Sequence, residues 1–158
     1  MKTVYWDANV FHALFSAEAG RVEICSRIES AAKRGEVQIY TSAMTQTECV
    51  WLKGLPRLSP QHEEVIARFF MHKFIRLVSC DRVMGESARA LLWQYEHLHP
   101  KDSIHVASAL SQQVEILHSY DKDLLALDGK IGNPPLKISV PDWPDPPQVP
   151  PPEAKLAI

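Results

Sequence analysis

The first twelve residues read Met1-Lys-Thr-Val-Tyr-Trp-Asp-Ala-Asn-Val-Phe-His12, and they decide how the rest of the chain is arranged. Residues 4–6 are β-branched or aromatic and too few for a helix, so they predict a short buried strand. Asp7 stands where this strand ends, and in an open α/β sheet the carboxyl ends of the strands border the ligand crevice. Asp7 is therefore a candidate catalytic carboxylate, although an aspartate equally suits the N-cap of a helix over residues 8–16.

The remaining chain alternates between short strands and longer helices. Apolar patterns predict strands over residues 37–40, 74–78, 115–119 and 137–140, the last at a sheet edge. Helical spacing predicts helices over residues 8–16, 21–34, 43–52, 61–73, 81–97 and 103–113, and a short helix after residue 121 that Gly129 ends. Val65 and Val83 belong to the predicted buried faces of two of these helices. The order predicts a three-layer α/β/α fold around a mostly parallel sheet of four to five strands.

Four further acidic residues fall at positions comparable to that of Asp7. Glu48 lies in the predicted helix over 43–52, in line with two large apolar side chains, and Asp102 opens the helix over 103–113. Asp121 and Asp123 follow the strand over 115–119. Right-handed crossovers place the ends of parallel strands along one edge of the sheet, where these carboxylates can meet. Each residue also has a purely structural interpretation, as an exposed glutamate or as a helix cap.

Carboxylates gathered in one crevice repel each other. Two unit charges about 5 Å apart at an effective dielectric of about 20 oppose each other by roughly 3 kcal/mol. Either some of the carboxylates are protonated or a divalent cation neutralises them. Oxygen ligands without cysteine favour Mg²⁺ or Mn²⁺ over Zn²⁺. A metal of this kind activates water for in-line attack on phosphorus, so the pattern points to phosphodiester hydrolysis.

Composition limits the class of protein. A chain of 158 residues, 46% hydrophobic and 23% charged, predicts one globular domain. Its net charge of −2 gives no global basic field, although a local basic stripe can still bind nucleic acid. The three cysteines fit neither a disulfide framework nor a zinc motif, and no apolar run is long enough to span a membrane. We therefore expect a cytoplasmic protein with reduced thiols and no membrane association.

The C-terminal end has a composition of its own. Seven of the twelve prolines fall between Pro141 and Pro152. This density predicts an extended polyproline-like segment, either a loosely docked terminus or a ligand for a partner domain. The expected division is therefore a nuclease domain over residues 1–140 and a Pro-rich tail over residues 141–158.

Four motifs in order resemble those of the PIN domain, and within it the VapC-like ribonuclease toxins. They are the segment 7–9 after the first strand, Glu48 on a mid-chain helix, residues 101–102 before an Ala-rich helix, and residues 119–123 after the fourth strand. The resemblance covers about residues 2–140. It implies Mg²⁺- or Mn²⁺-dependent cleavage of single-stranded RNA by the toxin of a toxin–antitoxin pair, with an antitoxin protein as partner and a homodimer as the assembly.

The resemblance also assigns roles by position. Asp7, Glu48 and Asp102 become the principal acidic cluster and Asp121 its fourth member, with Asp123 as an alternative metal ligand. Two small polar residues, Asn9 and Ser119, would support the acids by hydrogen bonding. The family often has Thr where Ser119 stands and an aromatic residue where Leu124 stands, and the Pro-rich tail is not a general family feature.

The sequence says less about contacts with a substrate than about the acidic positions. The candidate RNA contacts are basic residues beside the acidic motifs, with solvated surface as the alternative for each: Lys53, Arg57, Lys101 and Lys122. Trp6 and Trp51 are able to stack on bases, but their apolar surroundings favour core packing. The scattered histidines at positions 12, 97, 99, 105 and 118 are interpreted as structural or surface residues.

Other classes of protein fit less well. A haloacid-dehalogenase-like phosphatase needs a second Asp two residues after the first, and this chain has Asn9 there. A receiver domain needs paired acids near its phosphoacceptor and a lysine after a late strand. The remaining alternative is a non-catalytic PIN-like module that binds RNA or protein, against which the presence of all four acidic positions argues.

Overall fold

The computed structural model describes residues 1–52 and 56–144 of the chain. Within them, five strands alternate with helices. The strands are β1 (Lys2–Trp6), β2 (Val37–Ser42), β3 (Ile75–Val78), β4 (Ile116–His118) and β5 (Ile138–Ser139). The helices of the described residues are α1 (Ala8–Phe15), α2 (Val22–Lys33), α3 (Thr45–Glu48), α4 (Pro60–Phe69), α5 (Arg82–Gln94), α6 (Pro100–Ser111) and α7 (Lys122–Leu125). The predicted strand over 137–140 is present as β5.

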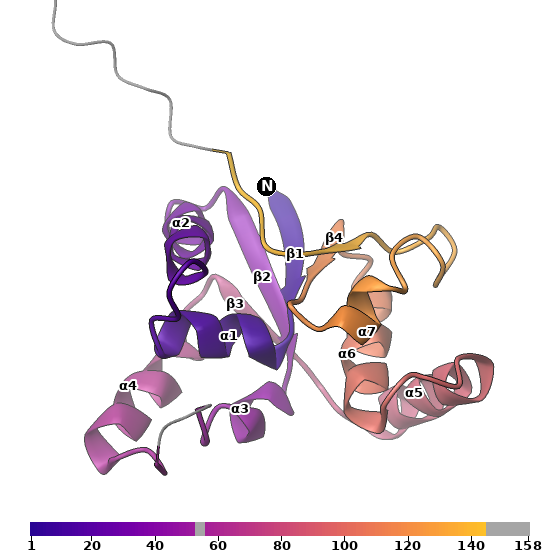
Figure 1. Cartoon of the computed structure of the whole chain (residues 1–158), viewed down its shortest axis with the longest axis horizontal. Coiled ribbons are helices and arrows are strands. Elements are labelled where there is room, and N and C mark those ends of the chain that lie inside the picture. Colours follow the sequence, from indigo (N-terminus) through magenta and orange to yellow (C-terminus); the bar gives the residue numbers. More distant parts are fainter. Residues whose placement is uncertain (53–55, 145–158) are drawn as a thin grey trace, which may run out of the picture.

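The five strands form one sheet in the order β3-β2-β1-β4-β5. All four pairings are parallel, and β1 lies at the centre with Val4 opposite Ile39 of β2 and Ile116 of β4. Parallel pairing in one sheet places the carboxyl ends of all strands at one edge, in Figure 1 the end of the sheet beside α1 and α3. The predicted three-layer α/β/α fold with a parallel sheet is therefore confirmed.

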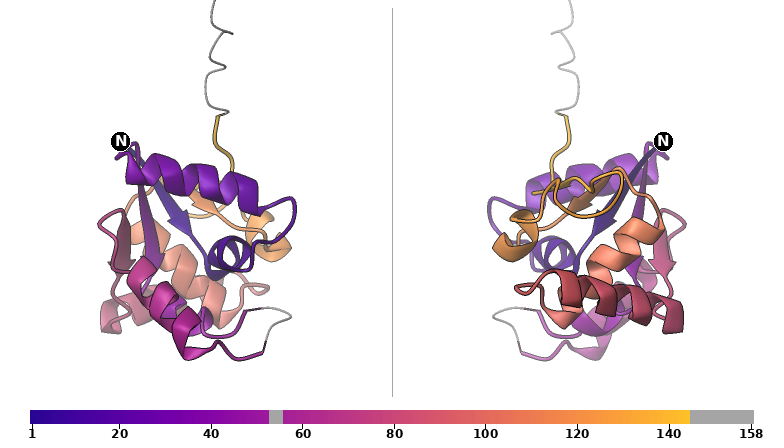
Figure 2. Two further views of the ribbon diagram at one scale, coloured as in Figure 1. Left: turned by 90° about the vertical axis from the view of Figure 1, so that its left-hand side faces the viewer. Right: turned by 90° about the vertical axis from the view of Figure 1, so that its right-hand side faces the viewer.

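The side chains of β1 point alternately to the two faces of the sheet, and each face has its own hydrophobic core. Val4 and Trp6 face a core formed with α1, α2 and α4, whereas Tyr5 faces the opposite core formed with α6 and α7. The two views of Figure 2 show α1, α2 and α4 over one face of the sheet and α5 and α6 over the other. Because side chains alternate across a strand, Tyr5 points to the face that α6 covers.

The predicted helix over 43–52 is wrong in length, since only Thr45–Glu48 is helical. Three side-chain contacts compete with helical bonding here. The Ser42 hydroxyl accepts from the Met44 amide at 3.1 Å, and the Thr47 hydroxyl donates to the Met44 carbonyl at 2.8 Å. His12 Nε2 donates to the Glu48 carbonyl at 2.8 Å, which removes an acceptor that a longer helix needs.

Three apolar residues expected in the interior are on the surface. Trp51 is 60% exposed and follows the end of α3, so its expected core packing is wrong. Val65 on α4 and Val83 on α5 are also exposed, although both were expected on buried helix faces. Ile66 and Met84, which were expected on the same faces, are buried, so each buried face is narrower than its pattern predicted.

The chain after β5 still packs on the domain. Pro141 is buried, and Trp143 packs against the α1/α2 core with Lys2 Nζ 5.1 Å from its ring centroid. Residues 145–158 lie outside the described residues, so the division at residue 141 stays a prediction. Among the helices of residues 1–52 and 56–144, none has the length and apolar character of a membrane span.

Candidate active site

Asp7 occupies the carboxyl end of the central strand and is buried. Its Oδ1 accepts the Val10 amide at 3.2 Å, which makes Asp7 the N-cap of α1. Its Oδ2 accepts the Ser119 hydroxyl at 2.5 Å, from the residue that follows β4. The capping interpretation and the functional interpretation of Asp7 therefore do not exclude each other, because its second oxygen faces the neighbouring strand end.

The Asp7 carboxyl titrates well above its ordinary range. Burial raises its pKa to about 6. The charge of His105 and the hydrogen bonds from Ser119 and Val10 oppose this rise, while the nearby Asp102 carboxylate adds to it. A buried carboxylate that feels a second carboxylate is a frequent feature of functional sites.

Asp102 lies in the first turn of α6, at the same edge of the sheet. Pro100 begins this helix at a position where a missing amide costs nothing. The Asp102 side chain is half-buried, and no described residue donates a hydrogen bond to it or forms an ion pair with it. Burial raises its pKa, and the neighbouring Asp121 carboxylate raises it further. Asp102 is thus a partly desolvated carboxylate without a direct partner.

Glu48 is held by two basic side chains, one at each oxygen. Lys101 Nζ lies 3.1 Å from its Oε1, and His105 Nε2 lies 2.9 Å from its Oε2. Burial acts to raise the pKa of Glu48, but the hydrogen bonds and charges of His105 and Lys101 outweigh it and hold the pKa below its usual value. Glu48 is therefore the member of the cluster whose ionised form is directly paired with basic side chains.

The contact between His105 and Glu48 was missed by the interpretation of the histidines as structural or surface residues. His105 is fully buried on α6, three residues after Asp102 and on the same helix face. The only sequence signal was this spacing from Asp102, since the other contact of His105, 2.8 Å from its Nδ1 to the Tyr5 hydroxyl, joins distant residues. His12 also reaches Glu48, through the backbone carbonyl.

Ser119 connects two of the acidic residues. Its hydroxyl donates to Asp7 and accepts the Asp121 amide at 2.9 Å. Asp121 caps α7 by accepting the Asp123 amide at 2.8 Å, and Asp123 is exposed with His99 Nε2 at 3.9 Å from its carboxylate. The Asn9 side chain is exposed in the first turn of α1, and no described carboxylate accepts a hydrogen bond from it.

The candidate RNA contacts have different surroundings. Lys53 lies outside the described residues. Lys101 is engaged with Glu48, which raises the pKa of Lys101. Arg57 is exposed, with its guanidinium 6.0 Å from the centroid of the exposed Trp51 ring, and Lys122 is exposed on α7.

The carboxylate oxygens of this site are the type of ligand that a hard divalent cation prefers, but the structure does not group them closely. Asp7, Asp102 and Asp121 offer carboxylate oxygens. The Asp102 carboxylate raises the pKa of Asp7, and the Asp121 carboxylate raises the pKa of Asp102. A cation would relieve the repulsion between them. Within residues 1–52 and 56–144, however, no three His, Cys, Asp or Glu side chains are grouped closely enough to hold a metal ion. Glu48 faces Lys101 and His105 instead of the aspartates.

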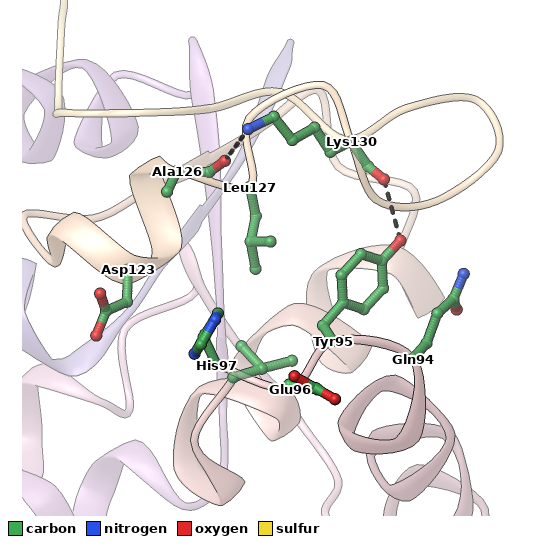
Figure 3. A pocket seen from close by; sticks show the side chains of 9 residues that line it. Gln94, Tyr95, Glu96, His97, Asp123, Ala126, Leu127 and Lys130 are labelled. Atoms are coloured by element: carbon green, nitrogen blue, oxygen red, sulfur yellow. Dashed lines mark hydrogen bonds between the residues drawn. The ribbon is translucent and has the colours of Figure 1, made fainter.

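A pocket of about 510 Å³ adjoins the α7 side of this edge. Figure 3 shows Leu127 and His97 pointing into it and Asp123 at its margin. The Tyr95 ring borders the pocket and is fixed by a 3.0 Å hydrogen bond from its hydroxyl to the Lys130 carbonyl. Apolar walls with a few polar groups and a volume of this order are typical of small-ligand pockets.

The fold and these acidic positions define the class of protein. The PIN domain family matches residues 4–130, and the chain belongs to that family. The resemblance found in the sequence is thereby confirmed.

Solved structures of toxins share the fold. The toxin VapC20 of Mycobacterium tuberculosis, described as cleaving the sarcin–ricin loop, is 16% identical with a TM-score of 0.62, over 78% of this chain and 93% of its own. A toxin–antitoxin complex from Klebsiella pneumoniae is 20% identical with a TM-score of 0.60, over 89% of this chain and 99% of that one. VapBC2 of Rickettsia felis, bound to a DNA fragment from its promoter, is 13% identical with a TM-score of 0.61 over the same shares. No curated protein sequence matches the chain.

Proposed function

We propose that this protein is a Mg²⁺- or Mn²⁺-dependent endoribonuclease that hydrolyses phosphodiester bonds of RNA. The observation that carries the proposal is the arrangement of Asp7, Asp102 and Asp121. They come from three separate elements of a PIN fold, and desolvation and mutual repulsion raise the pKa values of Asp7 and Asp102. A site of this kind lacks a counter-charge that a hard divalent cation supplies.

The residues of the site have different roles in this reaction. Asp7 and Asp102 would hold the cation, with Asp121, Glu48 and Asp123 as the further candidate ligands. When bound, the cation supplies Lewis-acid activation of water and neutralises charge on the phosphate. Ser119 fixes the orientation of the Asp7 carboxylate, and Lys101 offers positive charge to a phosphate oxygen at the mouth of the site.

We further propose that the chain is the toxin of a toxin–antitoxin pair. Its fold neighbours include VapC20 and two complexes of a toxin with an antitoxin. By this proposal the partner is an antitoxin protein, the assembly is a homodimer and the site of action is the cytoplasm. Exposed large apolar residues, among them Trp51, Met71 and Trp93, are available for such contacts.

The second candidate function is a PIN-like module that binds RNA or protein without cutting it. Two observations favour it. No described group of three ligands is gathered for a metal, and Lys101 and His105 already neutralise Glu48. The two functions differ in whether a divalent metal binds and supports cleavage.

The deciding experiment uses the purified, partner-free protein and labelled structured and unstructured RNAs. Each RNA is incubated with Mg²⁺, with Mn²⁺ and with EDTA, using the wild type, Asp7→Asn and Asp81→Asn. Asp81 is the N-cap of α5, as Asp7 is of α1, so Asp81→Asn controls for the loss of a capping carboxylate. We expect metal-dependent cutting that Asp7→Asn abolishes and Asp81→Asn retains. Binding of RNA without cutting, and without affinity for Mn²⁺, would establish the binding module instead.

A further inference from the structure

A chain of buried hydrogen bonds runs from the end of β2 to the Glu48 carboxylate. The Ser42 amide donates to the Tyr5 hydroxyl oxygen at 2.8 Å. The Tyr5 hydroxyl lies 2.8 Å from His105 Nδ1, and His105 Nε2 lies 2.9 Å from Glu48 Oε2. Tyr5, Ser42 and His105 are all buried, so water does not compete for these bonds.

Donor and acceptor roles along this chain follow from the groups present. The Tyr5 oxygen already accepts a hydrogen bond from the Ser42 amide, so in the neutral form of His105 the single Tyr5 proton is directed to Nδ1. Nδ1 is then the acceptor, and the ring proton resides on Nε2. From Nε2 it is donated to a Glu48 carboxylate oxygen. The Ser42 amide thus favours the form of the neutral ring in which Nε2, the nitrogen that faces Glu48, carries the proton.

The two partners of Glu48 differ greatly in exposure. The His105 side chain is 2% exposed and fixed on its other side by Tyr5, which also packs against its ring at 5.8 Å between centroids. The Lys101 side chain is 65% exposed and has four flexible methylenes. A lysine that is solvated in this way loses little when it leaves its partner, because water can replace the contact at its ammonium. The Oε2 side of Glu48 is therefore fixed, whereas its Oε1 side is replaceable.

We propose that Tyr5 and His105 are positioning residues that fix the Glu48 carboxylate, and that Lys101 is its exchangeable partner, replaced at Oε1 when a divalent cation binds. This inference rests on the proposed function, because it concerns the same acidic site. It adds His105 as a fixed hydrogen-bonding partner of Glu48, and Lys101 as a positive charge that is present before a cation binds.

The test is Tyr5→Phe, which keeps the aromatic ring and removes only the hydroxyl. Partners that orient metal ligands contribute about 10- to 100-fold to metal affinity. We expect Tyr5→Phe to weaken Mn²⁺ binding, measured by electron paramagnetic resonance without RNA, by about 10-fold. The matched control is Tyr95→Phe, which also removes one hydrogen-bonded hydroxyl, here the one that donates to the Lys130 carbonyl at 3.0 Å. Its affinity for Mn²⁺ should equal that of the wild type.

A second readout does not depend on metal. Long-range ¹H–¹⁵N spectra of the metal-free protein report which nitrogen of His105 is protonated. The wild type should show the Nε2–H form, and Tyr5→Phe a mixture of forms. If Tyr5→Phe does not fold, His105→Gln and His105→Leu replace it. The Gln amide can still donate to Glu48, so we expect Mn²⁺ affinity within about 3-fold of the wild type for Gln and about 10-fold weaker for Leu.

The outcomes separate this inference from the proposed function. Equal Mn²⁺ affinity in the wild type and Tyr5→Phe, with RNA cleavage by the wild type, overturns the positioning role and leaves the nuclease in place. A wild type that neither binds Mn²⁺ nor cuts RNA overturns the proposed function, and the positioning role with it. Weaker Mn²⁺ binding in Tyr5→Phe but not in the control variant, together with a mixture of protonated forms at His105, supports the inference.

Discussion

The Ser119 hydroxyl donates a 2.5 Å hydrogen bond to Asp7 Oδ2, across the boundary between the central strand and its neighbour β4. The same hydroxyl accepts the Asp121 amide, so one small side chain orders two of the four acidic positions. Ser119 is fully buried, so water does not compete for these two hydrogen bonds.

Removing this hydroxyl should impair the site without unfolding the protein. We expect Ser119→Ala to reduce RNA cleavage by about 10-fold, because Asp7 loses the donor that orients it. Ser119→Thr keeps the hydroxyl and should retain most activity. Initial rates under saturating Mn²⁺ measure both. Equal rates for Ala and Thr variants would show that the hydrogen bond does not matter for cleavage.

The raised pKa of Asp7 has a consequence for stability. Its pKa lies at about 6 in the folded protein against 3.8 unfolded, so between these values the folded state binds more protons. Stability of the metal-free protein therefore falls as pH rises from about 4 through 6, and the loss is complete above pH 6.

Asp7→Asn should remove this penalty. We expect it to raise the free energy of unfolding in EDTA at pH 7 by about 2 kcal/mol, since a shift of about two pKa units corresponds to about 3 kcal/mol and the amide loses one acceptor. The gain should vanish at pH 3.5, where both states of the wild type are protonated. Urea titrations at the two pH values give the comparison. A variant less stable than the wild type at pH 7 would contradict the electrostatic account.

Lys101 should compete with a divalent cation for Glu48. We expect Lys101→Met to bind Mn²⁺ a few-fold more tightly than the wild type, because the ammonium no longer occupies Oε1. The free energy of unfolding should change by less than about 1 kcal/mol, since the Lys101 side chain is largely exposed and Glu48 keeps its contact with His105. Lys73→Met, at an exposed lysine that precedes β3, is the control. Weaker Mn²⁺ binding in Lys101→Met would show that the lysine supports the metal rather than opposing it.

The aromatic cluster under α1 should carry much of the stability of its layer. Phe11 is fully buried and contacts the rings of Trp6, Phe15 and two further phenylalanines. We expect Phe11→Ala to lower the free energy of unfolding by about 3–5 kcal/mol through the cavity it leaves. Trp93→Ala, at a residue 79% exposed, should change it by less than about 0.5 kcal/mol. Urea denaturation monitored by circular dichroism compares the two variants.

Much of the fold was predictable because its strands carry strong local signals. The first strand, the parallel order and the edge strand near residue 138 follow from apolar runs between helical patterns. The position of Asp7 at the end of a buried strand and its role as a helix cap were also predictable, whereas its role in the site stays a proposal. These features depend on residues close together in sequence.

The parts that sequence reasoning missed depend on contacts between distant residues. The helix over 43–52 is cut short by the His12 contact with the Glu48 carbonyl, 36 positions away. His105 was passed over because its contact with Tyr5 joins residues 100 positions apart. Periodicity records which face of an element is apolar, but not which polar atom on another element a buried histidine will reach.

The central claim is that a divalent metal held at Asp7 and Asp102 drives RNA cleavage. Its most direct test is the single-turnover rate of RNA cleavage by Asp102→Asn against the wild type in Mn²⁺, with folding checked by circular dichroism. Loss of a metal ligand should remove several kcal/mol of transition-state stabilisation, so the rate should fall by at least about 100-fold and the wild type should be inactive in EDTA. Full activity of a folded Asp102→Asn variant, or of the wild type in EDTA, would contradict the claim.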